Sequence, residues 1–229
     1  VKEMDDPTRH EKIRNFTFGS YDDYLNFKKK TSPLYNVPIN TSPHSYKEIL
    51  NYIGENKFLS FLIDEKYGGI KLSVSELSSV LTKIASQNPA LGVITMVPNS
   101  LGPSELLLNY GTEEQKDKYL PKLANGEYIP CFGLTGPHNG SDATGSIDQG
   151  TVIINSEGKK VIEIEINKRY ITLGPIANLI GLAFKVNDYY ELLDQKREGV
   201  TVALIENNLS GLKQETHHNP LNAGFPNGT

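Results

Sequence analysis

The stretch ANGEYIPCFGLTGPHNGSD, residues 124–142, separates two parts of the chain that differ in hydrophobic periodicity. Before it, apolar residues recur at intervals of three and four, which is typical of helices that pack through one face. After it, apolar and polar residues alternate with a period of two, as in strands with one buried face. Helices first and strands second predict an α+β fold and argue against a doubly wound nucleotide-binding fold.

The helices before this stretch are marked by their first and last residues. Three are expected to begin at capping boxes, in which Ser or Thr precedes Glu or Gln by three positions: SYKE (45–48), SVSE (73–76) and TEEQ (112–115). Another is expected to begin at Pro103 and to end at Gly111. Pro121 is expected to stop the helix that TEEQ opens. These signals predict a helical domain over residues 45–127, after an irregular, proline-containing lead-in over residues 1–44.

Strands are expected beyond the stretch. In KKVIEIEIN, apolar positions alternate with polar ones at Ile162, Ile164 and Ile166. TVIIN precedes this segment across SEG, which predicts a hairpin with Gly158 at positive φ. ITL, LIGLAFKV and VTVALIE are further strand candidates. The pattern predicts an antiparallel β domain, a barrel or sandwich, over residues 128–229.

Composition and charge exclude several functional classes. A net charge of −4 provides no basic surface for nucleic acid. The runs FLSFLI and LGVITMV are far shorter than the roughly 20 residues of a membrane-spanning helix. Cys131 is the only cysteine, which excludes an internal disulfide and a multi-cysteine metal site, and we expect it to pack as a small apolar residue. A reducing, cytoplasmic location is therefore expected.

Two motifs around residues 124–142 resemble those of the acyl-CoA dehydrogenase family. In that family a GT-x-EQK-x-KYLP-x-LA-x-GE helix leads into an LTEP-x-x-GSD loop, and this chain reads GTEEQKDKYLPKLANGE and LTGPHNGSD. NKRYITLG resembles the next strand of the family, commonly W-I-T, and KYGG resembles an earlier YGG turn. RYITLGPIANLIGLAFKV and the later PLNAGFPNG look closest to the enzymes that begin fatty-acid β-oxidation in enteric bacteria. The resemblance covers residues 45–229.

The resemblance implies FAD-dependent α,β-dehydrogenation of acyl-CoA thioesters to trans-2-enoyl-CoA. A flat flavin needs backbone close to its polar edge, which glycine permits. The family places flavin contacts at Phe132, Gly133, Leu134, Thr135, Gly140, Ser141, Tyr170, Ile171 and Thr172. Within this set the resemblance implies flavin hydrogen bonds from Thr135 and Thr172 and a substrate contact from Ser141. Tyr170 stands where many members place tryptophan against the ring.

Taken singly, these residues also have simpler interpretations. The hydroxyls of Thr135 and Ser141 are typical of turns. Tyr170 in an alternating segment is typical of core or cross-strand packing. Asp142 after Gly-Ser is expected to cap local backbone. The two motifs in order favour the flavin site over these alternatives.

The chain departs from the family pattern beside the expected site. Gly136 stands where glutamate is common, and His138 and Asn139 replace a small pair before GSD. His138 can donate to a phosphate, but we expect an exposed turn residue. His217 and His218 face opposite sides of an extended segment and lack accompanying carboxylates, so no metal site is expected.

The resemblance places the catalytic base outside this sequence. In the family, a glutamate of a C-terminal helical domain removes the proton from Cα, and that domain completes the flavin site and the oligomer. No acidic residue here matches it by motif, so we assign no catalytic residue and expect a β domain incomplete at Thr229, with the C-terminal domain absent. The implied partners are acyl-CoA, an electron-transferring flavoprotein and, in the full-length protein, further copies of itself.

Two other functions stay open. The chain can be a truncated, non-catalytic relative that serves as a binding module or is an inactive fragment. It can also belong to an acyl-CoA oxidase, which passes electrons to oxygen. The isolated chain is expected to be inactive, and relatives imply either a cytoplasmic site or the periphery of the inner membrane.

Overall fold

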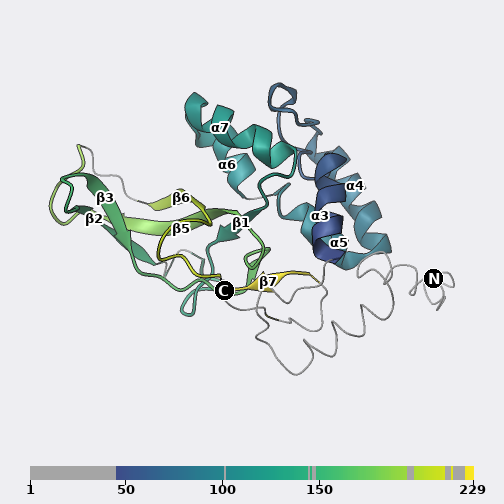
Figure 1. Ribbon diagram of the computed structural model, residues 1–229. Coiled ribbons are helices and arrows are strands. Elements are labelled where there is room, and N and C mark those ends of the chain that lie inside the picture. The colour runs from purple at the N-terminus through teal and green to yellow at the C-terminus, as the bar shows by residue number, and fades with distance from the viewer. Residues whose placement is uncertain are drawn as a thin grey trace.

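The computed structural model describes residues 45–100, 102–143, 145, 148–194, 199–214, 218 and 225–229. The lead-in over residues 1–44 lies outside this part, as do the side chains of the SYKE segment. Helices occupy one end of the molecule and a sheet the other (Figure 1), which is the order that the change in periodicity predicts. Within the described residues, no helix is long and apolar enough to cross a membrane.

The helical end contains five α-helices and one short 3-10 helix among the described residues. They are α3 (Ser45–Glu55), η2 (Glu65–Tyr67), α4 (Val74–Gln87), α5 (Pro89–Met96), α6 (Pro103–Tyr110) and α7 (Glu113–Ala124). Both capping boxes with described side chains form as expected. The Ser73 N–H donates to the Glu76 carboxylate at 2.8 Å, and the Thr112 N–H donates to the Gln115 side-chain oxygen at 3.0 Å. Pro103 and Gly111 bound α6 as expected.

Pro121 does not end α7, and that expectation was wrong. The helix continues through Pro121 to Ala124. The proline leaves the Asp117 carbonyl without its N–H donor, but Asp117 is exposed and water can replace that donor. The extra turn buries Leu123, which is 1% exposed. Burial of this side chain offsets the missing hydrogen bond.

The strands form a five-stranded sheet and a two-stranded sheet. They are β1 (Pro130–Gly133), β2 (Gln149–Ile154), β3 (Lys160–Ile164), β4 (Ile171–Thr172), β5 (Leu179–Asn187), β6 (Val200–Glu206) and β7 (Asn227–Gly228). The β2–β3 hairpin forms as expected, with Gly158 at a φ of 75°. The small sheet joins β4 to β7. All three further strand candidates are confirmed.

The larger sheet is mixed, which corrects the expectation of a purely antiparallel domain. β2 pairs with β3, and β5 with β6, in antiparallel fashion. β1 and β2 instead run parallel to β5. Parallel pairing needs a long connection, and residues 134–178 supply one between β1 and β5. Hydrophobic alternation predicts that a strand has a buried face but not the direction of its neighbour.

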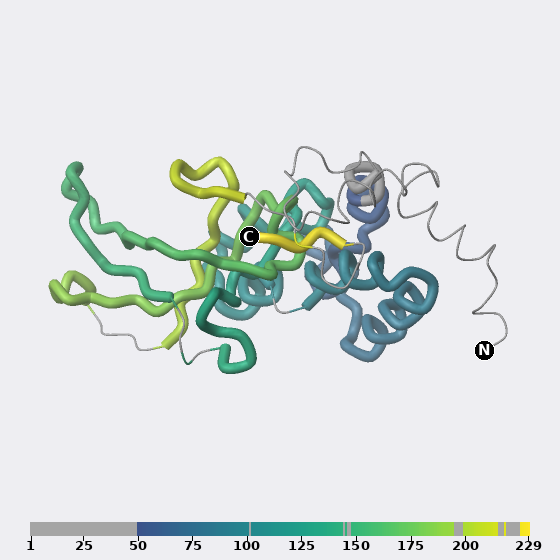
Figure 2. Tube along the Cα trace, turned by 90° about the horizontal axis from the view of Figure 1, so that it is seen from below, coloured from purple at the N-terminus to yellow at the C-terminus, as the bar shows by residue number. Residues whose placement is uncertain are grey.

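Two clusters of buried side chains join the helices to the sheet. The larger contains Ile53, Leu59, Leu91 and Ile94 from the helical end and Ile129, Cys131, Ile180, Leu182 and Phe184 from the strand end. The smaller packs Leu107, Leu120 and Leu123 against Leu179 of β5. The core therefore lies at the boundary between helices and sheet, and the chain ends near the middle of the molecule (Figure 2).

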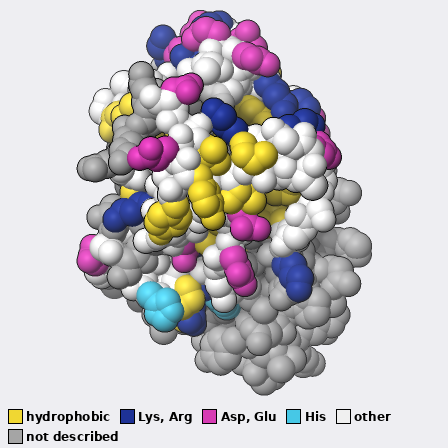
Figure 3. Space-filling model, turned by 90° about the vertical axis from the view of Figure 1, so that its left-hand side faces the viewer, with side chains coloured by type: hydrophobic (Ala, Val, Ile, Leu, Met, Phe, Trp, Pro, Cys, Tyr) yellow, Lys and Arg dark blue, Asp and Glu magenta, His cyan; other side chains and the backbone are white. Residues whose placement is uncertain are grey.

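The sheet end also exposes large apolar side chains. Figure 3 shows apolar side chains gathered between charged ones on this end. The exposed large hydrophobic residues of the two hairpins are Ile154, Ile162, Tyr189, Tyr190, Leu193 and Val200. Ile162 is thus 42% exposed rather than buried, because β3 is the outer strand of the sheet order.

Candidate functional site

The expected flavin loop leaves the sheet edge between two strands. β1 pairs with residues 179–182 of β5, and β2 pairs with residues 185–187 of the same strand. β6 occupies the opposite edge of β5, so β1 and β2 follow each other along one edge. The chain leaves this edge at Leu134, after β1, and reaches it again at Asp148, before β2. The Lys185 N–H donates to the Asp148 carbonyl at 2.8 Å, which fixes the returning end.

Asn139 holds the turn of this loop from inside. Its side-chain oxygen accepts the Gly136 N–H at 2.7 Å, and its Nδ2 donates to the carbonyls of Leu134 at 3.1 Å and Ala143 at 3.4 Å. Asn139 is only 8% exposed. A Cβ on Gly136 would lie 2.9 Å from the Asn139 side-chain oxygen, so a larger residue there would have to displace this oxygen from its hydrogen bond. The two departures from the family pattern, Gly136 in place of glutamate and Asn139 before GSD, are therefore linked, because the two residues contact each other in this turn.

The second motif lies directly beside the first. The Arg169 N–H donates to the Thr135 carbonyl at 3.0 Å. Lys168 Nζ donates to the Leu134 carbonyl at 2.9 Å and forms an ion pair with the Asp148 carboxylate. These contacts bring the end of β1 and the start of β4 together.

Tyr170 is exposed at this junction, which excludes its interpretation as a core residue. It has a φ of 59° and an exposed fraction of 54%. The Arg169 guanidinium lies 4.8 Å from its ring centroid, and the His218 ring centroid lies at the same distance. Asn227 Nδ2 donates to the Tyr170 carbonyl at 3.1 Å and to the Thr172 hydroxyl at 3.4 Å. β7 thus holds the backbone of the second motif.

The remaining predicted contacts differ in exposure. Thr135 and Thr172 are half-buried, whereas Ile171 is 6% exposed and packs in the core, so only its backbone can meet a ligand. Gly140 and Ser141 are exposed in the loop. No hydrogen bond or ion pair within the described residues links these two to the second motif.

Phe132 and Gly133 lie on β1, and Leu134 follows them. Phe132 and Leu134 are half-buried, and Gly133 is buried. A Cβ on Gly133 would lie 3.3 Å from the Leu182 side chain and 3.6 Å from Lys168 Cγ. The strand therefore approaches its neighbours closely at this glycine.

Three smaller expectations concern polar residues near the site, and the structure confirms each. The Asp142 carboxylate accepts the Gly145 N–H at 3.0 Å, as a local cap. His138 is exposed. Cys131 is buried, and burial raises the pKa of its thiol to about 12, which removes it as a nucleophile at neutral pH. Within the described residues, no group of His, Cys, Asp and Glu could hold a metal ion.

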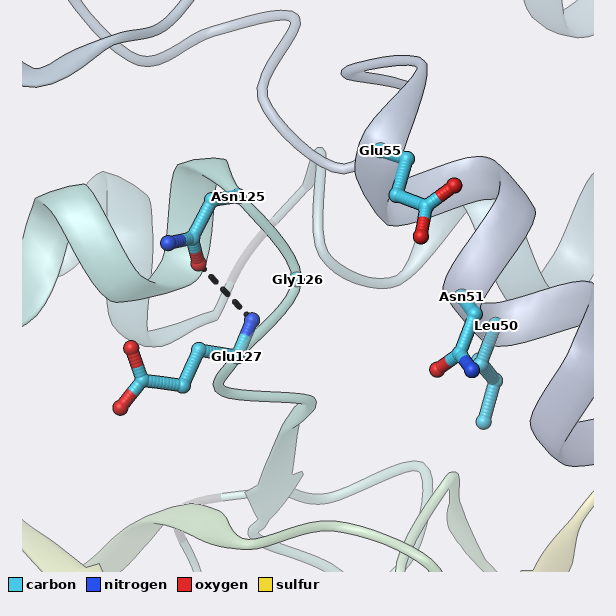
Figure 4. A pocket seen from close by; sticks show the side chains of 6 residues that line it. All are labelled: Leu50, Asn51, Glu55, Asn125, Gly126 and Glu127. Carbon is cyan, nitrogen blue, oxygen red and sulfur yellow. Dashed lines mark hydrogen bonds between the residues drawn. The ribbon is translucent and has the colours of Figure 1, made fainter.

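A separate hollow of about 260 Å³ lies between α3 and the turn after α7 (Figure 4). Its lining residues are Leu50, Asn51, Glu55, Asn125, Gly126 and Glu127. Asn125 accepts the Glu127 N–H at 2.9 Å, and the Glu127 carboxylate pairs with Lys122 at 3.1 Å. None of the predicted site residues lines this hollow, and Asn125 and Glu127 are engaged in local structure.

Sequence reasoning missed three residues that hold the site: Lys168, Asp148 and Asn227. The sequence did carry a signal for Lys168. This residue continues the alternation of Ile162, Ile164 and Ile166, so its charge falls on the side of the segment that carries these apolar side chains. A lysine on a face that is expected to be buried requires a partner. Asp148 and Asn227 had no such signal, since their partners are distant in the sequence.

Comparison with known proteins agrees with this arrangement. The sequence model described as "Acyl-CoA dehydrogenase, N-terminal domain" matches residues 35–127. An acyl-CoA dehydrogenase of Bacillus subtilis is 31% identical over 80% of this chain and 45% of its own length. A 3-(aryl)acrylate reductase of Clostridium sporogenes is 31% identical over 68% of this chain and 41% of its own length. The chain thus spans less than half of these relatives.

A solved structure extends the likeness to the whole described fold. The acyl-CoA dehydrogenase of Bacillus anthracis, complexed with FAD, superposes with a TM-score of 0.68 at 22% identity, over 100% of this chain and 35% of the other. This likeness covers both the helices and the mixed sheet. The family model, the sequence relatives and the fold agree, and the chain belongs to the acyl-CoA dehydrogenase family.

Proposed function

We propose that this chain is the flavin- and substrate-contacting part of an FAD-dependent dehydrogenase that converts acyl-CoA thioesters to trans-2-enoyl-CoA, the first step of fatty-acid β-oxidation. The observation that carries the proposal is the convergence of two motifs at the end of β1. Lys168 and Arg169 fasten the segment around Thr135 to the segment around Tyr170. The convergence assembles hydroxyl, backbone and aromatic groups at one surface.

The residues of this surface fit a flat, polar-edged cofactor. The Thr135 hydroxyl forms no hydrogen bond within the described residues and is free to donate. The Thr172 hydroxyl accepts from Asn227, so its own proton is also free. A Cβ on Gly140 would meet no protein atom within 4 Å, so protein packing does not require glycine there and a ligand can approach the backbone. FAD, when bound, supplies the acceptor for the hydride that leaves the acyl chain.

The described residues of the site supply binding and orientation rather than proton abstraction. Asp142 caps Gly145, and Asp148 is paired with Lys168, so neither carboxylate is free to act as the base. We assign the base to no residue of this chain and propose that the whole protein supplies it as a glutamate. We further propose Ser141 as a substrate contact, an electron-transferring flavoprotein as electron acceptor and a homo-oligomer as the assembled form.

The test uses the purified chain loaded with FAD and passed through a gel-filtration column. We expect flavin to elute with the protein and to stay oxidised when a long-chain acyl-CoA is added without oxygen. Bleaching would contradict the absence of a base in this chain. Elution of all flavin as the free compound would contradict the cofactor site and favour a non-catalytic relative. With a longer chain that turns over, rapid oxygen consumption would favour an oxidase.

A further inference from the structure

We propose that Lys168 and Asp148 are a positioning pair that sets the geometry of the flavin loop, an inference that rests on the proposed function. Neither residue belongs to the predicted flavin contacts. Their ion pair joins the second motif to the point where the loop returns to the sheet. Lys168 Nζ also donates to the Leu134 carbonyl at 2.9 Å, which lies where the loop leaves the sheet.

The burial of this pair distinguishes it from the ion pairs on the surface. The Lys168 side chain is 9% exposed and that of Asp148 26%. By contrast, the side chains of the Lys159–Glu157 pair are 73% and 65% exposed. Removing a lysine from water costs free energy that only good partners offset, and an apolar side chain would fill the same space at lower cost. The buried ammonium of Lys168 therefore indicates that its directed hydrogen bond to the Leu134 carbonyl is needed.

The loop after β1 needs such a hydrogen bond for its backbone. Once the chain leaves β1, its backbone groups lose their partners in the sheet, and buried backbone groups need replacements. Lys168 Nζ supplies one to the Leu134 carbonyl, and the Arg169 N–H supplies one to the Thr135 carbonyl. The Lys185 N–H fixes Asp148 to β5 at 2.8 Å. A continuous series of contacts thus runs from the sheet through Asp148 and Lys168 to Leu134.

Leu134, at the end of this series of contacts, directly precedes Thr135, whose hydroxyl we assign to the flavin. Leu134 is the chain neighbour of Thr135, so fixing its carbonyl also fixes the backbone that carries the Thr135 side chain. Close packing leaves little freedom, because a Cβ on Gly136 would lie 3.2 Å from the Asn167 carbonyl and 3.5 Å from the Asp148 carboxylate. Lys168 therefore acts on the cofactor through Thr135 without touching it.

The experiment compares the 229-residue chain with K168M and D148N, with K168R as the conservative variant and K159M as the control for loss of a surface lysine. Two readouts are measured for each protein: the dissociation constant for FAD, with the absorption spectrum of the bound flavin, and the hydrogen exchange of the Gly136 and Arg169 amides. Far-ultraviolet circular dichroism checks that each variant folds.

We expect K168M and D148N to weaken FAD binding about tenfold or more and to speed exchange at both amides, with an altered flavin spectrum. K168R should keep a substantial part of the FAD affinity and of the amide protection that K168M loses. K159M should change neither FAD binding nor amide exchange. Unchanged affinity and exchange in folded K168M and D148N would overturn the inference. Should the unaltered chain retain no FAD, the proposed cofactor site fails, while the exchange of the two amides still supports or overturns the anchoring role.

Discussion

At the scale of single residues, Thr135 is the most direct test of the cofactor site. Its hydroxyl has no partner within the described residues, whereas its carbonyl is held by Arg169. T135V removes the hydroxyl and keeps the shape, so we expect FAD binding to weaken by about 0.5–1.5 kcal/mol with little loss of stability. Equilibrium titration with FAD measures this. S156A, in the turn of the β2–β3 hairpin, is the control, and an equal loss in both variants would argue against a specific role for Thr135.

Asn99 shows how a single buried amide can hold the helical end together. Its side-chain oxygen accepts the Phe61 N–H at 2.8 Å, and its Nδ2 donates to the carbonyls of Phe58 at 2.6 Å and Thr95 at 2.9 Å. N99A leaves two buried backbone groups and one partly buried group without these partners. We expect the free energy of unfolding to fall by about 2–4 kcal/mol in a urea titration. N109A, which removes one exposed hydrogen bond to Glu105, should cost far less.

His218 should make stability depend on pH near the site. Burial, aided by the positive charge of Arg169, lowers the pKa of His218 below its ordinary value of 6.5. The unfolded chain therefore binds a proton at this residue before the folded chain does, and stability falls as pH drops through 6.5 towards the lower folded pKa. H218F keeps an aromatic ring beside Tyr170 and should reduce this loss. Urea unfolding at about pH 7.5 and about pH 5.5 measures the difference, and equal losses in both proteins would contradict the assignment.

At the scale of elements, α7 carries a proline that the helix tolerates without needing it. Pro121 deprives the exposed Asp117 carbonyl of a backbone donor. P121A restores the donor and removes the ring, so we expect a gain of about 1 kcal/mol or more in the free energy of unfolding, measured by urea titration. A loss would mean that the proline's restriction of the unfolded chain outweighs its cost in the helix. P137A, in the exposed turn of the loop, is the control for the loss of a proline outside a helix.

The elements divide into those that local sequence specifies and those that it does not. α4 and α7 begin where their capping boxes predict, and the β2–β3 hairpin forms around Gly158, because these signals act within a few residues. α5 was missed, since half of the residues of PALGVITM are buried and the helix shows no polar face. The parallel pairing of β1 and β2 with β5 was also missed, because it depends on contacts distant in the sequence.

The candidate site divides in the same way. The positions of Thr135 and Tyr170 follow from motifs that resemble a known family, and the structure brings those motifs together. The residues that hold these motifs together could be predicted from the sequence only in part. The sequence pattern indicates Lys168, because this charged residue continues the alternation of Ile162, Ile164 and Ile166. Its partners Asp148 and Leu134 lie elsewhere in the chain. Long-range polar contacts leave no periodicity in the sequence.

At the scale of the whole molecule, the described helices and sheet share two clusters of buried side chains. Leu179 of β5 is 0% exposed and packs in a cluster with Leu107 of α6 and Leu120 of α7. The larger cluster likewise contains residues from both ends. Because neither end can bury these side chains alone, we expect helices and sheet to unfold in one cooperative transition rather than as separate domains over residues 45–127 and 128–229.

L179A tests this coupling. Truncating a fully buried leucine at the boundary should lower the free energy of unfolding by about 2–5 kcal/mol. Circular dichroism of the helices and exchange of amides in β5 and β6 should report the same shifted midpoint in urea, because the lost contacts belong to both ends. L209A, at a site that is 55% exposed, should leave the midpoint nearly unchanged. Two separate transitions, with only the sheet destabilised by L179A, would show that the helical end is an independent domain.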